Sequence, residues 1–216
     1  MFNRVFIIVY CSLLVLGGCI YKEEPIPQIA YEYRSEVVPP KLSKPVRTQT
    51  NIDNYIPRGW LPAPHIEKKW TAIVIHHSGT KEGNTAMFDK WHREGRHWEG
   101  VGYDFVIGNG SNSGDGQVEV TFRWREQKTG AHCGGTPGNW ANRYSVGICL
   151  VGNFNYTAPT ARQMQSLLEL IRFLQRRYNI PKSRIYGHQD TPGYPGKTKC
   201  PGRRFPMARL KSMLDF

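Results

Sequence analysis

The chain has 216 residues, a formal net charge of +12 and a sequence pI of about 9.6, and 12% of its residues are aromatic. The aromatic content excludes an intrinsically disordered chain, and the length suffices for one domain with a sizeable core plus an appended segment. The positive charge favours anionic surroundings. Because the basic residues are scattered and no nucleic-acid-binding motif accompanies them, we expect no nucleic acid partner.

Residues 1–19 have the pattern of an export signal. Arg4 gives a positive start, and the apolar run from Val5 to Leu16 is shorter than the ~20 residues that a membrane-spanning helix needs. The ending Leu16-Gly-Gly-Cys19 resembles a bacterial lipoprotein box, in which cleavage leaves Cys19 as the lipid-carrying N-terminus. We therefore expect an exported protein of the cell envelope, anchored to the membrane through Cys19. The alternative is an ordinary signal peptide with an incidental cysteine.

Residues 20–56 have the composition of a linker. Prolines alternate with charged residues and no apolar periodicity is present, which favours an extended tether. At about 3.3 Å per residue the linker reaches at most about 120 Å, so a domain on it could act well away from a membrane. We expect the folded domain over residues 57–216.

The hydrophobic pattern of this domain predicts a single α/β domain in which a central mixed β-sheet is flanked by helices. Thr160 and Gln163 form a capping-box start for a long amphipathic helix. Cys133 and Cys149 are expected to be buried thiols. The expected strands are 71–76, 101–107, 118–124, 145–151 and 184–187, and the expected helices are 85–96, 160–178 and 205–214.

Histidine and cysteine residues at the two ends of this domain suggest a metal site. The first apolar strand delivers His76 and His77 to its end, and the far end of the chain supplies His188 and Cys200. Two imidazoles and a thiolate match the ligand set of a catalytic zinc ion with an open fourth position. Adjacent strand residues point to opposite faces, so His76 and His77 are rivals for one ligand position.

Several short motifs, taken together in order and spacing, resemble those of the zinc-dependent N-acetylmuramoyl-L-alanine amidases, the family shared by phage lysozyme-type amidases and peptidoglycan recognition proteins. The resemblance covers roughly residues 58–205. Its carriers are Arg58-Gly-Trp60, Ile73-Val-Ile-His76-His77-Ser, Val101-Gly-Tyr103-Asp-Phe105-Val-Ile, Gly130-Ala-His132, Asn142-Arg-Tyr-Ser145-Val-Gly-Ile, Val151-Gly-Asn153-Phe154, Gly187-His188-Gln-Asp190 and Cys200-Pro-Gly202.

The resemblance implies that His76, His188 and Cys200 bind Zn²⁺, and it places the ligand of the histidine pair at His76. His77 is then expected to pack or form a hydrogen bond beneath the sheet. The implied reaction is cleavage of the peptidoglycan amide between N-acetylmuramic acid and L-alanine by a zinc-activated water. Tyr103 occupies the position of the family's catalytic tyrosine, which orients water or stabilises the oxyanion.

Two positions depart from branches of the family. Cys149 stands where the cytoplasmic recycling amidases have a glutamate, so the tyrosine-using branch fits better. Thr198 stands where phage amidases have a lysine, and the recognition proteins that are catalytic resemble this chain there. We expect Thr198 to assist catalysis by donating a hydrogen bond to the oxyanion, with Lys197 as the alternative.

The resemblance also implies substrate contacts for His132, Asn142 and Trp91, with a structural role as the alternative for each. His65, His92 and His97 have no ligand-like partner and are expected at the surface or in helix packing. A second hypothesis for the whole protein is a non-catalytic peptidoglycan-binding module of the same fold. Such modules typically lose the cysteine ligand, and Cys200 is present here. The sequence carries no signal for an oligomeric state.

Overall fold

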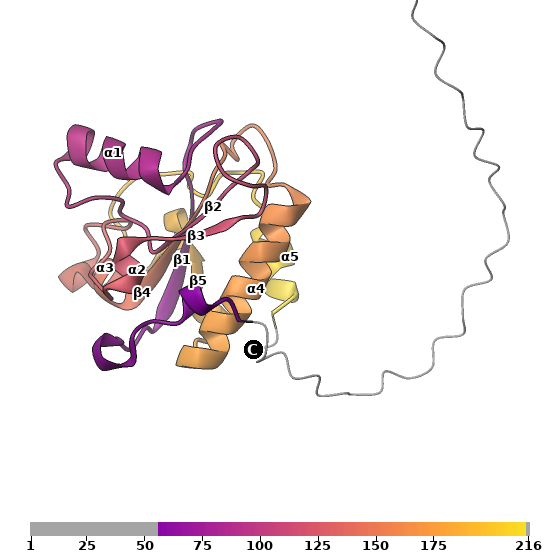
Figure 1. The fold of residues 1–216 in the computed structure, drawn as a ribbon. Helices are drawn as coiled ribbons and strands as arrows, with labels where there is room; N and C mark the ends of the chain where they lie inside the picture. Colours follow the sequence, from indigo (N-terminus) through magenta and orange to yellow (C-terminus); the bar gives the residue numbers. More distant parts are fainter. Residues whose placement is uncertain (1–55, 215–216) are drawn as a thin grey trace, which may run out of the picture. The chain divides into compact units, whose positions relative to one another are not determined.

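The computed structural model describes residues 56–214, so the predicted signal segment, Cys19 and most of the linker lie outside the described residues. The described part is a five-stranded sheet with helices on both faces (Figure 1). Its strands are β1 Ala72–His77, β2 Phe105–Ile107, β3 Val118–Val120, β4 Ser145–Leu150 and β5 Ile185–Gly187. Its helices are α1 Thr85–Arg96, α2 Phe122–Arg125, α3 Trp140–Tyr144, α4 Ala161–Tyr178 and α5 Met207–Ser212. Single 3₁₀ turns cover Arg58–Trp60, Pro64–Ile66, Pro137–Asn139, Lys182–Arg184 and His188–Asp190.

The sheet is mixed, as the sequence predicts. Its strand order is β3-β2-β4-β1-β5, and β3 is the antiparallel member, paired with β2 at one edge. The other four strands run parallel, so their carboxyl ends meet along one edge. Strands β1 and β4 are in the middle of the sheet and are buried along nearly their whole length. Continuous apolar runs are typical of such strands because both of their faces are covered.

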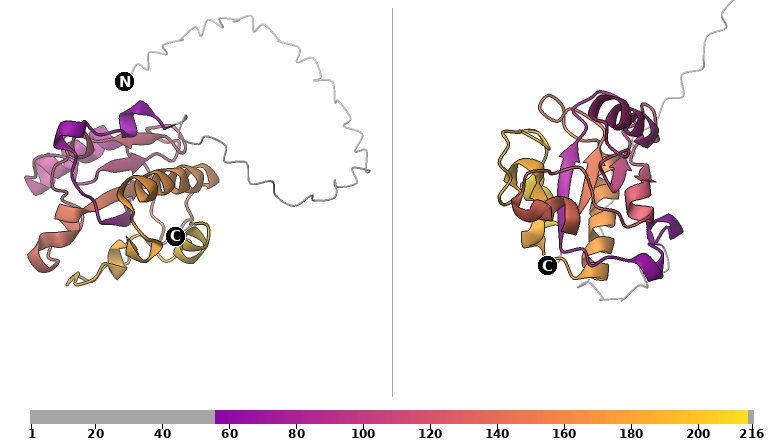
Figure 2. Two further views of the ribbon diagram at one scale, coloured as in Figure 1. Left: turned by 90° about the horizontal axis from the view of Figure 1, so that it is seen from below. Right: turned by 90° about the vertical axis from the view of Figure 1, so that its left-hand side faces the viewer.

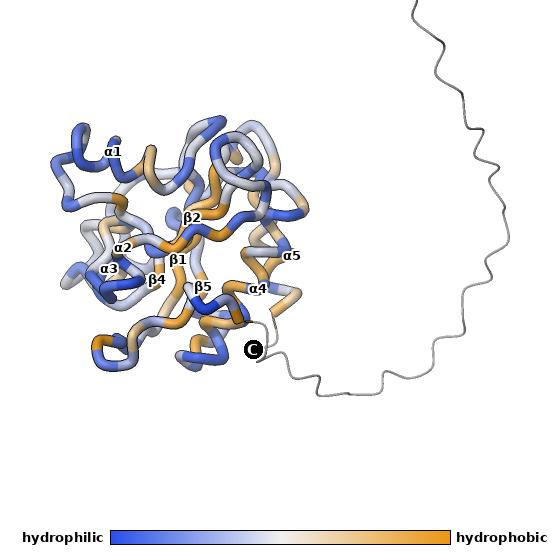
Figure 3. Tube along the Cα trace, in the orientation of Figure 1, coloured by the Kyte–Doolittle hydropathy of each residue, from blue (hydrophilic) through white to orange (hydrophobic). Residues whose placement is uncertain are grey.

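The two faces of the sheet bury different side chains. Ile73 and Ile75 of β1 point into the main core beneath α4, together with Ile148 of β4. On the opposite face Val74 packs near α3, while Cys149 packs with Phe88 of α1. Figure 2 shows the helices on either side of the sheet. In Figure 3 many strand residues are orange, whereas blue residues are frequent in α1 and in the loops. His76 belongs to the same face as Val74, because side chains alternate along a strand.

The helix predictions are largely confirmed. Helix α1 spans Thr85–Arg96 as predicted, with the Asn84 side chain accepting the hydrogen bond from the Met87 amide. The predicted capping box at the start of α4 is present in both directions, between Thr160 and Gln163. The final helix is shorter than predicted, since α5 covers Met207–Ser212. Among the described residues, no helix is both long and apolar enough to cross a bilayer.

Two strand predictions were too long. The segment before β2 leaves the sheet because its amides are held by α1: Val101 donates to Asp89, and Gly102 donates to His92 Nδ1. The strand predicted over 118–124 ends at Val120. Thr121 there accepts a hydrogen bond from the Arg123 amide and so caps the short helix α2. The alternation of apolar residues continued past the cap, which is why the sequence suggested a longer strand.

Candidate metal centre

Neighbouring parallel strands bring the first two predicted ligands together. Ile75 of β1 lies opposite Gly187 of β5, so the next residues, His76 and His188, stand side by side at the carboxyl edge of the sheet. Their ring centroids are 4.7 Å apart. Cys200 comes from the loop before α5, and its Sγ lies 3.8 Å from His76 Nδ1. One ligand atom from each of the three residues lies within 4.8 Å of the others.

These separations fit a zinc ion with small adjustments. A tetrahedral ion with bonds of about 2.0 Å to nitrogen and 2.3 Å to sulfur places those ligand atoms about 3.6 Å apart. His188 Nε2 is buried and has no hydrogen-bond partner among the described residues. Buried imidazole nitrogens are normally paired, so an unpaired one on a histidine that belongs to a cluster of nitrogen and sulfur donors is consistent with a metal ligand. The residues present therefore suit Zn²⁺.

Burial sets the protonation of the three side chains. It lowers the pKa of His188 to about 4, and it lowers the pKa of His76 well below its ordinary value, with nearby imidazoles adding to the effect. Both rings are therefore neutral at pH 7, the form that binds metal. Burial also raises the pKa of the Cys200 thiol to about 12. A bound cation would favour the thiolate and displace that proton.

His77 lies apart from this group, as expected from its place on the strand. Its Nδ1 accepts a hydrogen bond from the Phe154 amide at 3.0 Å, and the two rings are 5.9 Å apart. Its amide donates to Cys200 Sγ at 3.3 Å. The side chain thus supports the loop after β4, while the backbone helps to place the cysteine.

Tyr103 borders the metal centre. Its ring lies 5.3 Å from that of His76, and both residues line a hollow of about 300 Å³. The phenol packs against Cys149, which is fully buried. Burial is the main cause that raises the pKa of Tyr103 well above its ordinary value, so the phenol keeps its proton and can donate it in a hydrogen bond.

Thr198, and not Lys197, lines the same hollow. The Thr198 hydroxyl oxygen accepts a hydrogen bond from the Cys200 amide at 3.1 Å. Because this bond uses an oxygen lone pair, the hydroxyl proton stays available for another acceptor. Of the two alternatives raised by the sequence, the geometry favours Thr198.

The three predicted substrate contacts have different surroundings. His132 is 7% exposed, and its Nδ1 lies 3.1 Å from His76 Nε2. Asn142 is buried, and its Oδ1 accepts hydrogen bonds from the amides of His132 and Cys133. Both line a second hollow of about 420 Å³ that also reaches His188. Trp91 is 42% exposed on α1 and lines neither hollow, so the structure does not bring it to the metal centre.

A family model described as N-acetylmuramoyl-L-alanine amidase matches residues 67–203. The chain belongs to this amidase family. Peptidoglycan-recognition protein SC2 of Drosophila melanogaster is 31% identical over 138 residues, which cover 60% of this chain and 66% of that protein. The chain thus spans slightly less than two thirds of the length of that relative.

Solved structures of the family have the same fold. N-acetylmuramoyl-L-alanine amidase LysC from Clostridium intestinale URNW is 33% identical, with a TM-score of 0.55, over 67% of this chain and 84% of that chain. Peptidoglycan recognition protein-LE, solved in complex with tracheal cytotoxin, a monomeric diaminopimelic acid-type peptidoglycan, is 25% identical. Its TM-score is 0.53, over 68% of this chain and 82% of that chain.

In this family member the end of α1 supplies residues to the site that sequence reasoning missed. His92, Arg96 and Trp98 line the hollow beside Tyr103. His92 accepts a hydrogen bond from the Gly102 amide, and its ring lies 4.9 Å from the Trp98 ring. The spacing of His92 and Arg96 places them on one helix face. The sequence thus indicated that His92 and Arg96 share a helix face, but it did not indicate that this face lines the site.

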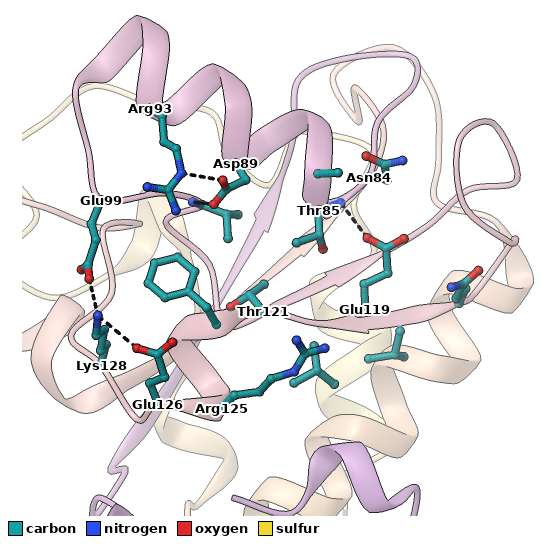
Figure 4. Close-up of a pocket in the computed structure, with 16 residues that line it drawn as sticks. Asn84, Thr85, Asp89, Arg93, Glu99, Glu119, Thr121, Arg125, Glu126 and Lys128 are labelled. Atoms are coloured by element: carbon teal, nitrogen blue, oxygen red, sulfur yellow. Dashed lines mark hydrogen bonds and ion pairs between the residues drawn. The ribbon is translucent and has the colours of Figure 1, made fainter.

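A larger hollow of about 970 Å³ lies elsewhere, between α1 and the edge strand β3 (Figure 4). No residue predicted for the site lines it. Five of its charged side chains form ion pairs: Arg93 with Asp89 at 2.6 Å, and Lys128 with Glu126 at 3.0 Å and with Glu99. Glu119 instead accepts a hydrogen bond from the Thr85 amide. Most of the charge at this hollow is thus neutralised in surface ion pairs.

Proposed function

We propose that this amidase-family chain is a zinc-dependent N-acetylmuramoyl-L-alanine amidase that hydrolyses peptidoglycan. The observation that carries the proposal is the convergence of His76, His188 and Cys200, with an unpartnered buried nitrogen on His188. Two neutral imidazoles and one thiolate leave a divalent ion with one net positive charge and an open position. An ion held there would activate water, so no side-chain nucleophile would be required.

The chain's own residues have separate roles in the proposed hydrolysis. His76, His188 and Cys200 hold the metal ion. When bound, the ion would supply Lewis-acid polarisation of the scissile carbonyl. The protonated phenol of Tyr103 donates a hydrogen bond toward the reacting oxygen atoms, and the Thr198 hydroxyl stabilises negative charge on the carbonyl oxygen. The amide nitrogen of L-alanine leaves with a proton, and the lactyl group of the muramic acid keeps the carboxylate.

The rival function is recognition of peptidoglycan without cleavage. The structural relatives include a recognition protein bound to a peptidoglycan fragment, so binding alone is a real alternative for this fold. The retained Cys200 beside His76 favours the enzyme, because a binding groove has no need of a buried thiol between two imidazoles.

Mass spectrometry of muropeptides digested with and without a chelator tests the proposal. We expect stem peptides with a free N-terminal L-alanine, and their loss when the chelator removes the metal. Intact muropeptides that nevertheless bind to the protein would instead establish the recognition function. Products cleaved at a different bond would overturn the assigned specificity.

We further propose that the protein acts in the cell envelope as a lipoprotein tethered through Cys19. The support is the Leu16-Gly-Gly-Cys19 ending and the proline-rich segment that follows it. A net charge of +12 suits attraction to an anionic wall polymer.

A further inference from the structure

His76 takes part in a chain of two imidazoles that ends on the backbone of β4. Its Nε2 lies 3.1 Å from His132 Nδ1, and His132 Nε2 lies 3.4 Å from the carbonyl oxygen of Ser145. The rings of the two histidines meet edge to face, with centroids 5.0 Å apart. Both side chains are almost fully buried, so water has little access to these nitrogens.

When both contacts are hydrogen bonds between neutral rings, only one arrangement of protons satisfies them. A carbonyl oxygen only accepts, so His132 Nε2 must carry the proton of that ring. A neutral imidazole has one N–H, so His132 Nδ1 is an acceptor and His76 Nε2 must be the donor. His76 Nδ1 is then left without a proton, and this is the atom that faces Cys200 Sγ.

We propose that His132 is a positioning residue that fixes the tautomer and ring orientation of His76, so that His76 Nδ1 is presented to the metal ion. The inference rests on the proposed metal site and adds to it a role for His132 that differs from contact with substrate. Outer partners of this kind commonly raise metal affinity by holding a ligand imidazole in its binding form.

The surroundings of His132 are built around its ring. A Cβ atom added to Gly147 of β4 would lie 2.5 Å from His132 Cδ2, and one added to Gly130 would lie equally close. Asn142 Oδ1 fixes the His132 amide at 2.9 Å. The two glycines thus leave room for this imidazole, and Asn142 fixes the backbone that carries it.

The tautomer can be read directly in the unaltered protein. Two-bond nitrogen–proton correlation spectra of the metal-free protein distinguish protonated from bare ring nitrogens. We expect His76 to carry its proton on Nε2 and His132 to carry its proton on Nε2. A proton on His76 Nδ1 would overturn the proposal. This measurement uses the parent protein alone, so it depends neither on enzymatic activity nor on whether a variant folds.

Variants test the consequence for metal binding. Zinc affinity is measured by competition with a chromophoric chelator for the parent protein, His132→Leu, His132→Gln and the exposed control His65→Leu. We expect about 10- to 100-fold weaker binding for His132→Leu. His132→Gln should bind several-fold more tightly than His132→Leu, because a carboxamide can accept from His76 and donate to Ser145. The control should match the parent.

Gly147→Ala is a further variant that displaces the ring without removing it. Because its added methyl group collides with His132, we expect its zinc affinity to fall as well. If the His132 variants and Gly147→Ala keep parental zinc affinity while the Michaelis constant rises, His132 contacts substrate and the positioning role is wrong. If the parent protein itself binds no zinc, the proposed function fails, whereas the tautomer measurement still judges the hydrogen-bond chain.

Discussion

Asp104, next to Tyr103, is a fully buried carboxyl whose environment predicts an unusual dependence of stability on pH. Its Oδ2 accepts a hydrogen bond from the Gly147 amide at 2.7 Å, and its Oδ1 is buried with no partner among the described residues. Burial raises the pKa of Asp104 to about 7, although the Gly147 bond and the charges of Lys68 and Arg123 oppose the shift. In Asp104→Asn the carboxamide oxygen can still accept the hydrogen bond from the Gly147 amide.

Proton binding by Asp104 determines whether the free energy of unfolding rises or falls with pH. Between about pH 4 and pH 7 the native carboxyl holds a proton that the unfolded chain has lost, so the free energy of unfolding falls as the pH rises through this range. A shift of about three pKa units corresponds to about 4 kcal/mol in total at 1.36 kcal/mol per unit. About 2.5 kcal/mol of this falls between pH 5 and pH 8. Asparagine does not titrate, so the variant lacks this loss.

Urea denaturation of the metal-free parent and of Asp104→Asn at pH 5 and pH 8 measures the effect. Other groups, including the buried histidines, contribute equally to both proteins and cancel in the difference. We expect the stability of the variant relative to the parent to increase by about 2.5 kcal/mol from pH 5 to pH 8. A relative stability that is the same at both pH values would show that Asp104 is ionised in the native protein throughout and that its pKa is not raised.

Three other substitutions test separate parts of the account. Tyr103→Phe should retain zinc but lower turnover by about 10²-fold or more, since a hydrogen-bond donor to the reacting oxygens is lost; unchanged turnover would remove Tyr103 from the mechanism. Thr160→Ala should lower the free energy of unfolding by about 1 kcal/mol through loss of the capping box, measured by urea denaturation; no loss would mean that the cap of α4 is energetically silent. Cys19→Ala should move the protein from the membrane to the soluble fraction; unaltered partitioning would exclude Cys19 as the anchor.

The sequence predicted elements best where local signals agree. The β-branched run before His76 predicted β1, and the helical spacing of apolar residues after Thr85 predicted α1 with its observed bounds. The capping box at Thr160 did the same for α4. In each case the residues that define the element are close together in the chain, so local propensity and packing favour the same secondary structure.

Errors occurred where tertiary contacts override a local pattern. The residues before β2 alternate like a strand, but Asp89 and His92 of α1 take their amide hydrogen bonds. The role proposed for His132 was also hidden, because its partner His76 is 56 residues away in the chain and only the folded domain brings the two together. Family resemblance could place both histidines near the site, whereas the hydrogen bond between them is visible only in the structure.

In the proposed site one zinc ion is held by two imidazole nitrogens and one cysteine sulfur. X-ray absorption spectroscopy at the zinc edge, combined with metal analysis of the purified protein, measures this most directly. We predict about one zinc per chain, with nitrogen or oxygen neighbours at about 2.0 Å and a single sulfur neighbour at about 2.3 Å that disappears in Cys200→Ser. Zinc well below one per chain, or a spectrum without sulfur in the parent protein, would contradict the account.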